Sequence, residues 1–150
     1  MNIREINGSE VPELLECLSA LAEHHNSVSV SFKGSYPLSP YEDTLASFSE
    51  SLEKGTSRIA VTSSPEKIIG FCKIDITGDD GYLSHLVVLK EYRGSGYGKM
   101  LMDWAMEQFR KSDVRHIELK VVDGNGAIHL YEKYGFKMKS HTLCINFDHQ

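Results

Sequence analysis

The sequence lacks a long apolar run. No segment of its 150 residues approaches the ~18 consecutive apolar residues that a membrane-spanning helix requires. The first ten residues, MNIREINGSE, have neither the basic region nor the apolar region of a secretory signal. We therefore expect a protein without a membrane partner.

Cysteine is also scarce. Cys17, Cys72 and Cys144 are far apart and form no CxxC or similar spacing. This pattern argues against a disulfide framework and favours a reducing, cytoplasmic location. Cys72 and Cys144 lie in apolar-rich segments, so we expect both to be small buried residues.

An excess of positive charge is missing as well. The chain has 16 Lys and Arg against 21 Asp and Glu, a formal net charge of −5. Proteins that bind nucleic acid through its phosphates usually carry a basic face, so we expect no nucleic-acid partner. His24 and His25 are adjacent, but nothing nearby completes a metal-ligand spacing, and no metal is expected.

The apolar patterns that are present predict one domain over residues 1–150. The expected order is β-α-α-β-β-β-α-β-α-β-β, an α/β (α+β) fold with a mixed sheet and helices on both faces. The strands are expected at residues 2–6, 58–62, 68–76, 82–89, 116–122, 136–138 and 142–147. The helices are expected from Ser9 to about His24, then at residues 40–54, 101–112 and 127–134.

The second of these helices has a predicted start signal. In the sequence SPYE, Ser39 is expected as the N-cap, Pro40 as the first helical residue and Glu42 as the partner in a capping box.

The stretch EYRGSGYGKM, residues 91–100, places three glycines between a predicted strand and a predicted helix. The N–H groups of such a loop, with the N-terminus of the helix, can bind an anion. The dinucleotide fingerprint G-x-G-x-x-G fails, because from Gly94 the third glycine comes one residue early. The P-loop pattern fails because Arg93 stands where its first glycine should be and Met100 follows Lys99.

The same stretch does match the pattern [QR]-x-x-G-x-[GA], from Arg93 to Gly98. It resembles the acetyl-CoA loop of the GNAT N-acetyltransferase superfamily. Residues 127–136, AIHLYEKYGF, are similar to that superfamily's A-x-x-x-Y-E-K-x-G-F element, one helix and one strand further on. The resemblance implies a GNAT-like, mostly antiparallel twisted sheet flanked by helices, with acetyl-CoA as co-substrate and no metal.

The resemblance also assigns residues to the cofactor, on the strand before the loop, in the loop and beyond it. They are Leu86, Val87, Val88, Arg93, Gly94, Ser95, Gly96, Tyr97, Gly98, Lys99 and Asn125. The family's usual asparagine position corresponds to Gly124, one residue before Asn125. Asn125 could therefore contact the pantetheine arm or only cap the following helix.

Tyr131 matches the family's general-acid position, where a phenol faces the cofactor sulfur. An ordinary tyrosine pKa lies near 10, so at neutral pH the phenol still holds the proton that it must give. The alternative is a helix aromatic that only packs against the sheet. We expect Tyr134 to be structural.

The general base is left open among three residues, Tyr82, Ser84 and His85. Side chains alternate along a strand, which puts Tyr82, Ser84, Leu86 and Val88 on one face and His85 on the other. Tyr82 and Ser84 could hold a water if their face borders the acceptor. A bulge in the strand would reverse the assignment in favour of His85.

The resemblance implies direct acetyl transfer, within a ternary complex, to a primary amine on a small molecule or a peptide. Tyr36 and Tyr41 could line the acceptor site, and a homodimer is possible. The alternative function is a non-catalytic module that senses acyl-CoA and needs neither acid nor base.

Overall fold

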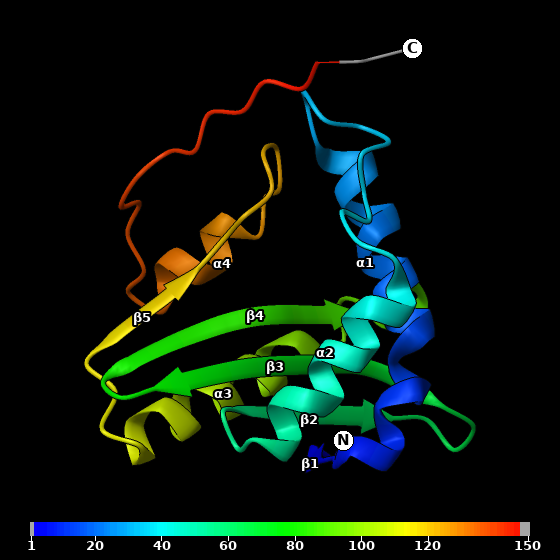
Figure 1. Cartoon of the computed structure of the whole chain (residues 1–150), viewed down its shortest axis with the longest axis vertical. Helices are drawn as coiled ribbons and strands as arrows, with labels where there is room; N and C mark the ends of the chain where they lie inside the picture. The colour runs from blue at the N-terminus through cyan, green and yellow to red at the C-terminus, as the bar shows by residue number, and fades with distance from the viewer. Residues whose placement is uncertain (1, 148–150) are drawn as a thin grey trace.

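The computed structural model describes residues 2–147 and contains one five-stranded sheet (Figure 1). The strands lie in chain order across it: β1 (Arg4–Glu5), β2 (Ser57–Ser63), β3 (Ile68–Thr77), β4 (Asp80–Val88) and β5 (His116–Leu119). The helices are α1 (Leu15–Val28), α2 (Tyr41–Glu53), α3 (Tyr97–Lys111) and α4 (Ile128–Lys133), with short 3₁₀ segments at Gly8–Leu14 and Lys90–Tyr92.

The pairing directions follow from the connections. Short turns join β2 to β3 and β3 to β4, and these pairs are antiparallel. A whole helix, α3, crosses over between β4 and β5, so these two strands pair in parallel. The expected mixed, mostly antiparallel sheet flanked by helices is confirmed.

Each face of the sheet has its own apolar core. One core joins α1, α2 and the first 3₁₀ segment to the sheet, through residues such as Leu18, Phe48 and Phe71. The other packs α3 against the opposite face, with Leu101 and Phe109 on Ile74 and Leu83. Figure 1 shows α1 and α2 on one side of the sheet and α3 on the other. We call these the α1/α2 face and the α3 face.

The prediction of two strands at the end of the chain is wrong. Residues 137–147 form no strand, and Leu143, Ile145 and Phe147 are 94%, 74% and 72% exposed. Alternating apolar residues make a strand only where another strand is available to pair with them. Cys144 is exposed with this segment, so its expected burial is wrong, whereas Cys72 is buried as expected.

Other element boundaries differ as well. The first helix begins as a 3₁₀ segment at Gly8, capped by Asn7, and continues to Val28 instead of about His24. The helix α2 begins one residue late, so Pro40 occupies the N-cap position and no side chain caps it. The capping box expected from Ser39 and Glu42 is therefore wrong. The strand β5 ends at Leu119, three residues early.

None of the helices within residues 2–147 is both long and apolar enough to cross a bilayer.

The close approach of β4 to α3 generates a stability prediction. A Cβ added at Gly81 would lie 2.6 Å from the ring of Phe109, which is only 1% exposed and has no room to move. We expect Gly81→Ala to lower the free energy of unfolding by roughly 1–3 kcal/mol through overpacking. Gly8→Ala is the control, because no atom lies within 4 Å of its added Cβ. Equal denaturation midpoints for the two variants would contradict this packing.

Candidate functional site

A β-bulge in β4 determines which side chains share a face. Lys73 of β3 pairs with His85, but the next residue, Ile74, pairs with Leu83. Ser84 is therefore an extra residue that is opposite no residue of β3 in the strand pairing, and the side-chain alternation shifts by one at this point.

The bulge reverses the alternation expected along this strand. Tyr82 lies opposite Asp75 and His85 opposite Lys73, on the α1/α2 face. Leu86 and Val88 pack with the core on the α3 face. The expectation that Tyr82 shares a face with Leu86 and Val88 is therefore wrong, and His85 joins Tyr82 instead.

The second half of β4 has an open edge. The parallel pairing with β5 covers only Asp80–Leu83 against His116–Leu119. Beyond these residues the two strands diverge, as Figure 1 shows. Among residues 2–147, Leu86, Val87 and Val88 therefore have a partner strand on the β3 side only. Their backbone groups on the other side are available to an extended ligand.

The glycine loop follows this open edge directly. Gly94 and Gly96 have φ values of 83° and 93°, which a side chain would strain, and Gly96 is the N-cap residue of α3. The first backbone N–H that makes a helical hydrogen bond is that of Met100, which donates to the Gly96 carbonyl. Within the described chain, the N–H groups of residues 94–99 have no backbone acceptor. They form a cluster of donors at the positive end of a helix, suited to an anion.

The two cationic side chains of the loop region, unlike its backbone N–H groups, have hydrogen-bond partners within the described part of the protein. Arg93 Nε donates to the Val88 carbonyl at 2.8 Å, and Lys99 Nζ donates to Asp103 at 2.7 Å. Tyr97 packs edge-on against Tyr92, and Ser95 is exposed. Both cations therefore stabilise the loop and helix here, each through one hydrogen bond.

Tyr131 of α4 and Tyr134, directly after the end of α4, have different surroundings. Tyr131 packs on the α3-face core and against Phe136, and burial raises the pKa of its phenol. No hydrogen bond from its hydroxyl is present within residues 2–147. The Tyr134 hydroxyl instead donates to Asp103 of α3 at 2.6 Å, which ties the two helices together.

A second contact joins the loop before α4 to the end of α1. The Asp123 carboxylate accepts hydrogen bonds from the Ser29 hydroxyl and from the N–H groups of Val30 and Ser31, at 2.7–2.9 Å. These bonds lower the pKa of Asp123, so the carboxylate stays charged at neutral pH. We call this contact the Asp123 latch. It bridges the two sides of the region where β4 and β5 diverge.

The latch leaves no room for a side chain at position 124. Gly124 has a φ of 80°, and a Cβ there would lie 2.2 Å from the Val28 carbonyl oxygen. Asn125 accepts a hydrogen bond from the Ala127 N–H at 3.0 Å and so caps the start of α4.

His85 lies in an apolar and positively charged setting. Its ring is 4.9 Å from that of Phe48 and 6.0 Å from that of Phe71, between centroids. Burial first, and then the charge of Lys73, lower its pKa to about 4, so the imidazole is neutral at neutral pH. The pKa of the Tyr82 phenol is shifted upward, because burial and the neighbouring Asp75 and Glu118 raise it.

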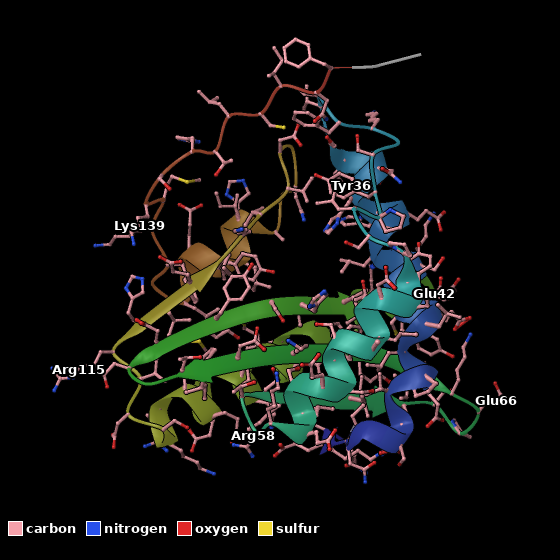
Figure 2. All side chains as sticks on the ribbon, viewed as in Figure 1. Tyr36, Glu42, Arg58, Glu66, Arg115 and Lys139 are labelled. Carbon is pink, nitrogen blue, oxygen red and sulfur yellow. The ribbon has the colours of Figure 1, made fainter. Side chains whose placement is uncertain are left out.

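A groove of about 450 Å³ lies beside Tyr82, on strands β3, β4 and β5. Its lining residues are Asp75, Thr77, Asp80, Gly81, Tyr82, His116 and Glu118. Two neighbours, His116 and Lys139, lower the pKa of Glu118 to about 2. Lys139, labelled in Figure 2, reaches Glu118 from the segment after α4 at 2.9 Å.

Tyr36, also labelled in Figure 2, lies beyond the end of α1, with its ring 5.2 Å from that of His25. Tyr41 packs against the α1/α2-face core.

Sequence reasoning missed three residues of this site: Lys73, Asp75 and Asp123. The charged pair inside the otherwise apolar IIGFCKIDI was a signal for the first two, because charges in a buried strand need partners. No local signal marks Asp123, since its partners lie more than 90 positions away. Within residues 2–147, no group of His, Cys, Asp and Glu could hold a metal ion.

Comparisons with known proteins agree on one family. The sequence profile of the acetyltransferase (GNAT) family matches residues 21–136. A ribosomal protein bS18 alanine N-acetyltransferase of Haemophilus influenzae is 36% identical over 70 residues, which cover 47% of this chain and 48% of that protein. A putative enzyme of the same name from Bacillus subtilis is 31% identical over 91 residues, 60% of each chain. The chain thus spans about half to three-fifths of the length of these relatives.

A solved structure supports the fold. PaiA N-acetyltransferase of Thermoplasma acidophilum, in complex with coenzyme A, superposes with a TM-score of 0.77. The match covers 94% of this chain and 92% of that one at 20% identity. At this identity the likeness concerns the fold alone.

The latch generates a prediction that needs no ligand. In Gly124→Ala the added Cβ meets the Val28 carbonyl and the backbone is held in a left-handed conformation, which costs roughly 1–3 kcal/mol. We expect faster amide hydrogen exchange at Val30 and Ser31, whose N–H groups bond to Asp123.

Gly126→Ala in the same loop is the matched control, because no atom lies within 4 Å of its added Cβ. If both variants left the exchange of these amides unchanged, the latch would not hold in solution.

Proposed function

Because the chain belongs to the acetyltransferase (GNAT) family, we propose that it transfers an acetyl group from acetyl-CoA directly to a primary amine. The observation that carries the proposal is the open edge of β4, which leads straight into the free N–H groups of the glycine loop. An extended thioester with an anionic end fits these two features together.

Acetyl-CoA would contact both the open edge of β4 and the glycine loop. The pyrophosphate of acetyl-CoA would bind the N–H groups of residues 94–98 at the positive end of α3. The pantetheine arm would lie along Leu86, Val87 and Val88 and pair with the open backbone edge. A backbone N–H near Val88 would polarise the thioester carbonyl and stabilise its oxyanion. Asn125, which caps the start of α4, is proposed to contact the pantetheine arm as well.

The proposed reaction moves two protons. The amine nitrogen attacks the thioester carbon, a C–N bond forms, and the tetrahedral oxyanion then collapses with cleavage of the C–S bond. The nitrogen loses one proton to a base, and the departing sulfur gains one from an acid. No step requires an acetylated side chain, so donor and acceptor would be bound together.

Tyr131 is proposed as the acid. Its pKa is raised by burial, so the phenol is protonated at neutral pH, and its hydroxyl has no hydrogen-bond partner within residues 2–147. A hydroxyl that is protonated and not already hydrogen-bonded is ready to donate to a thiolate beside it.

His85 is proposed as the base. The bulge places it on the α1/α2 face with Tyr82, and its neutral imidazole has a lone pair at neutral pH. The raised pKa of Tyr82 leaves that phenol protonated, so it is unsuited to accept a proton. The Ser84 hydroxyl contacts His85 at 3.0 Å and would position it.

The acceptor is proposed to be the α-amine of a polypeptide. Two relatives are named for an alanine of a ribosomal protein, and alanine has no side-chain amine, so their acceptor nitrogen is the α-nitrogen. An α-amine, with a pKa near 7.7–8.0, is roughly one-third neutral at pH 7.5, against roughly 0.1% for a lysine amine. A base with a pKa near 4 suits an amine of which a substantial fraction is already neutral.

Replacing Tyr131 tests the acid. We expect Tyr131→Phe to reduce kcat by about 10²-fold or more, because the leaving thiolate loses its proton donor. Coenzyme A affinity, measured by calorimetry, should not change. The control is Tyr134→Phe, which removes a phenol that is bonded to Asp103 instead. Equal activity in the two variants would rule out the assigned role of Tyr131.

An acceptor screen tests the reaction itself. Acetyl-CoA consumption would be followed with a peptide that begins with alanine, the same peptide with a blocked N-terminus, and polyamines. We expect turnover with the free α-amine and none with the blocked peptide. Coenzyme A binding without turnover on any amine would instead favour a sensor module.

A further inference from the structure

Lys73 is an unusual residue for the middle of a sheet. Its side chain is only 8% exposed, and it lies on the α1/α2 face, opposite His85. Buried lysines are rare unless they are paired. Lys73 Nζ is 2.6 Å from Asp75 Oδ1, which also accepts a hydrogen bond from the Ser57 hydroxyl, and it lies 5.1 Å from the centre of the Phe48 ring.

Lys73 holds the bulge residue at two points. Its Nζ donates to Ser84 Oγ at 3.4 Å, and its backbone carbonyl accepts from the same hydroxyl at 3.3 Å. Ser84 Oγ is also 3.0 Å from His85 Nδ1. One hydroxyl therefore has three partners, all within β3 and β4.

These contacts can be met together in one arrangement only. Lys73 Nζ, paired with a carboxylate, can only donate, and the Lys73 carbonyl can only accept. The single hydroxyl hydrogen of Ser84 must then point to the Lys73 carbonyl, which leaves two lone pairs on Oγ. One receives the lysine and the other must receive a proton carried on His85 Nδ1. If the Ser84 hydroxyl donated to His85 instead, no hydrogen would lie between Ser84 Oγ and the Lys73 carbonyl oxygen.

We propose that Lys73 is a positioning residue that, through Ser84, fixes His85 in the tautomer with the proton on Nδ1 and the lone pair on Nε2. The Nε2 atom is then the one that accepts a proton from the acceptor amine. The catalytic meaning of this tautomer rests on the proposed acetyl transfer, whereas the tautomer itself does not.

The charges around His85 support the arrangement. The groups that face it are Lys73 and Asp75 of β3 and His25 of α1. Lys73 and His25 lower the pKa of the imidazole and Asp75 raises it, with burial as the largest effect. The ring is therefore neutral in the physiological range, and the choice between its two tautomers is left to the hydrogen bond at Nδ1.

Nitrogen-15 NMR of histidine-labelled protein tests the tautomer without any substrate. In the unaltered protein we expect His85 Nε2 at the shift of an unprotonated nitrogen and Nδ1 at that of an N–H. Lys73→Met and Ser84→Ala should both release the ring toward the Nε2–H tautomer. Lys67→Met, in the turn between β2 and β3, is the control and should change nothing, because Lys67 is exposed and bonded to Glu16.

Kinetics supply a second readout. Ser84→Ala keeps the Lys73–Asp75 pair and should lower kcat on the order of 10²-fold, as expected for a base in the wrong tautomer, with KM for acetyl-CoA unchanged. In Lys73→Met the imidazole loses a neighbouring positive charge, so its pKa rises. As the pH falls, activity is then lost at a higher pH than in the unaltered protein.

The outcomes separate this proposal from the proposed function. An Nε2–H tautomer in the unaltered protein, or an unchanged ring in both Lys73→Met and Ser84→Ala, would overturn the role of Lys73 even if acetyl transfer is observed. The expected tautomer in a protein that acetylates no amine would support the positioning role and overturn the function.

Discussion

The divergence of β4 from β5 is the constraint on which the site depends. Their parallel pairing ends after Leu83 and Leu119, yet β4 continues to Val88, and no strand within residues 2–147 pairs with this part of its edge. Backbone groups inside a sheet need partners, so a strand edge that faces the interior of the fold is a place for an extended ligand. The turn at the end of this edge offers free N–H groups at Gly94 and Gly96. Recognition by backbone would explain why glycines and apolar residues dominate this half of the candidate site.

The bulge at Ser84 lets one strand serve two purposes. Beyond it, Leu86 and Val88 pack toward α3, so the free edge rests on a rigid core. Tyr82, before the bulge, and His85, directly after it, lie toward α1 and α2. A regular strand would separate these two side chains onto opposite faces. The extra residue therefore places Tyr82 and the proposed base on the same face of the sheet.

Much of the fold could be predicted because it depends on local patterns. The helical spacing around Leu101 and Phe109 and the apolar runs of β2, β3 and β4 give element types directly. The bulge could not be predicted, since it is defined by the pairing of Lys73 with His85 across two strands. The Asp123 latch joins residues more than 90 positions apart. The end of the chain shows the reverse error, because alternation at Leu143 and Ile145 predicted a strand for which the sheet offers no partner.

Amide hydrogen exchange with and without acetyl-CoA tests the central claim most directly, that the open edge of β4 and the glycine loop together form the donor site. The account predicts slower exchange at Leu86–Val88 and at residues 94–98 when acetyl-CoA is added, and no change in β1 and β2. The β1 and β2 strands lie on the far side of β3 and serve as an internal reference. Protection confined to the groove beside Glu118, or none in β4 and the loop at saturating acetyl-CoA, would contradict the account.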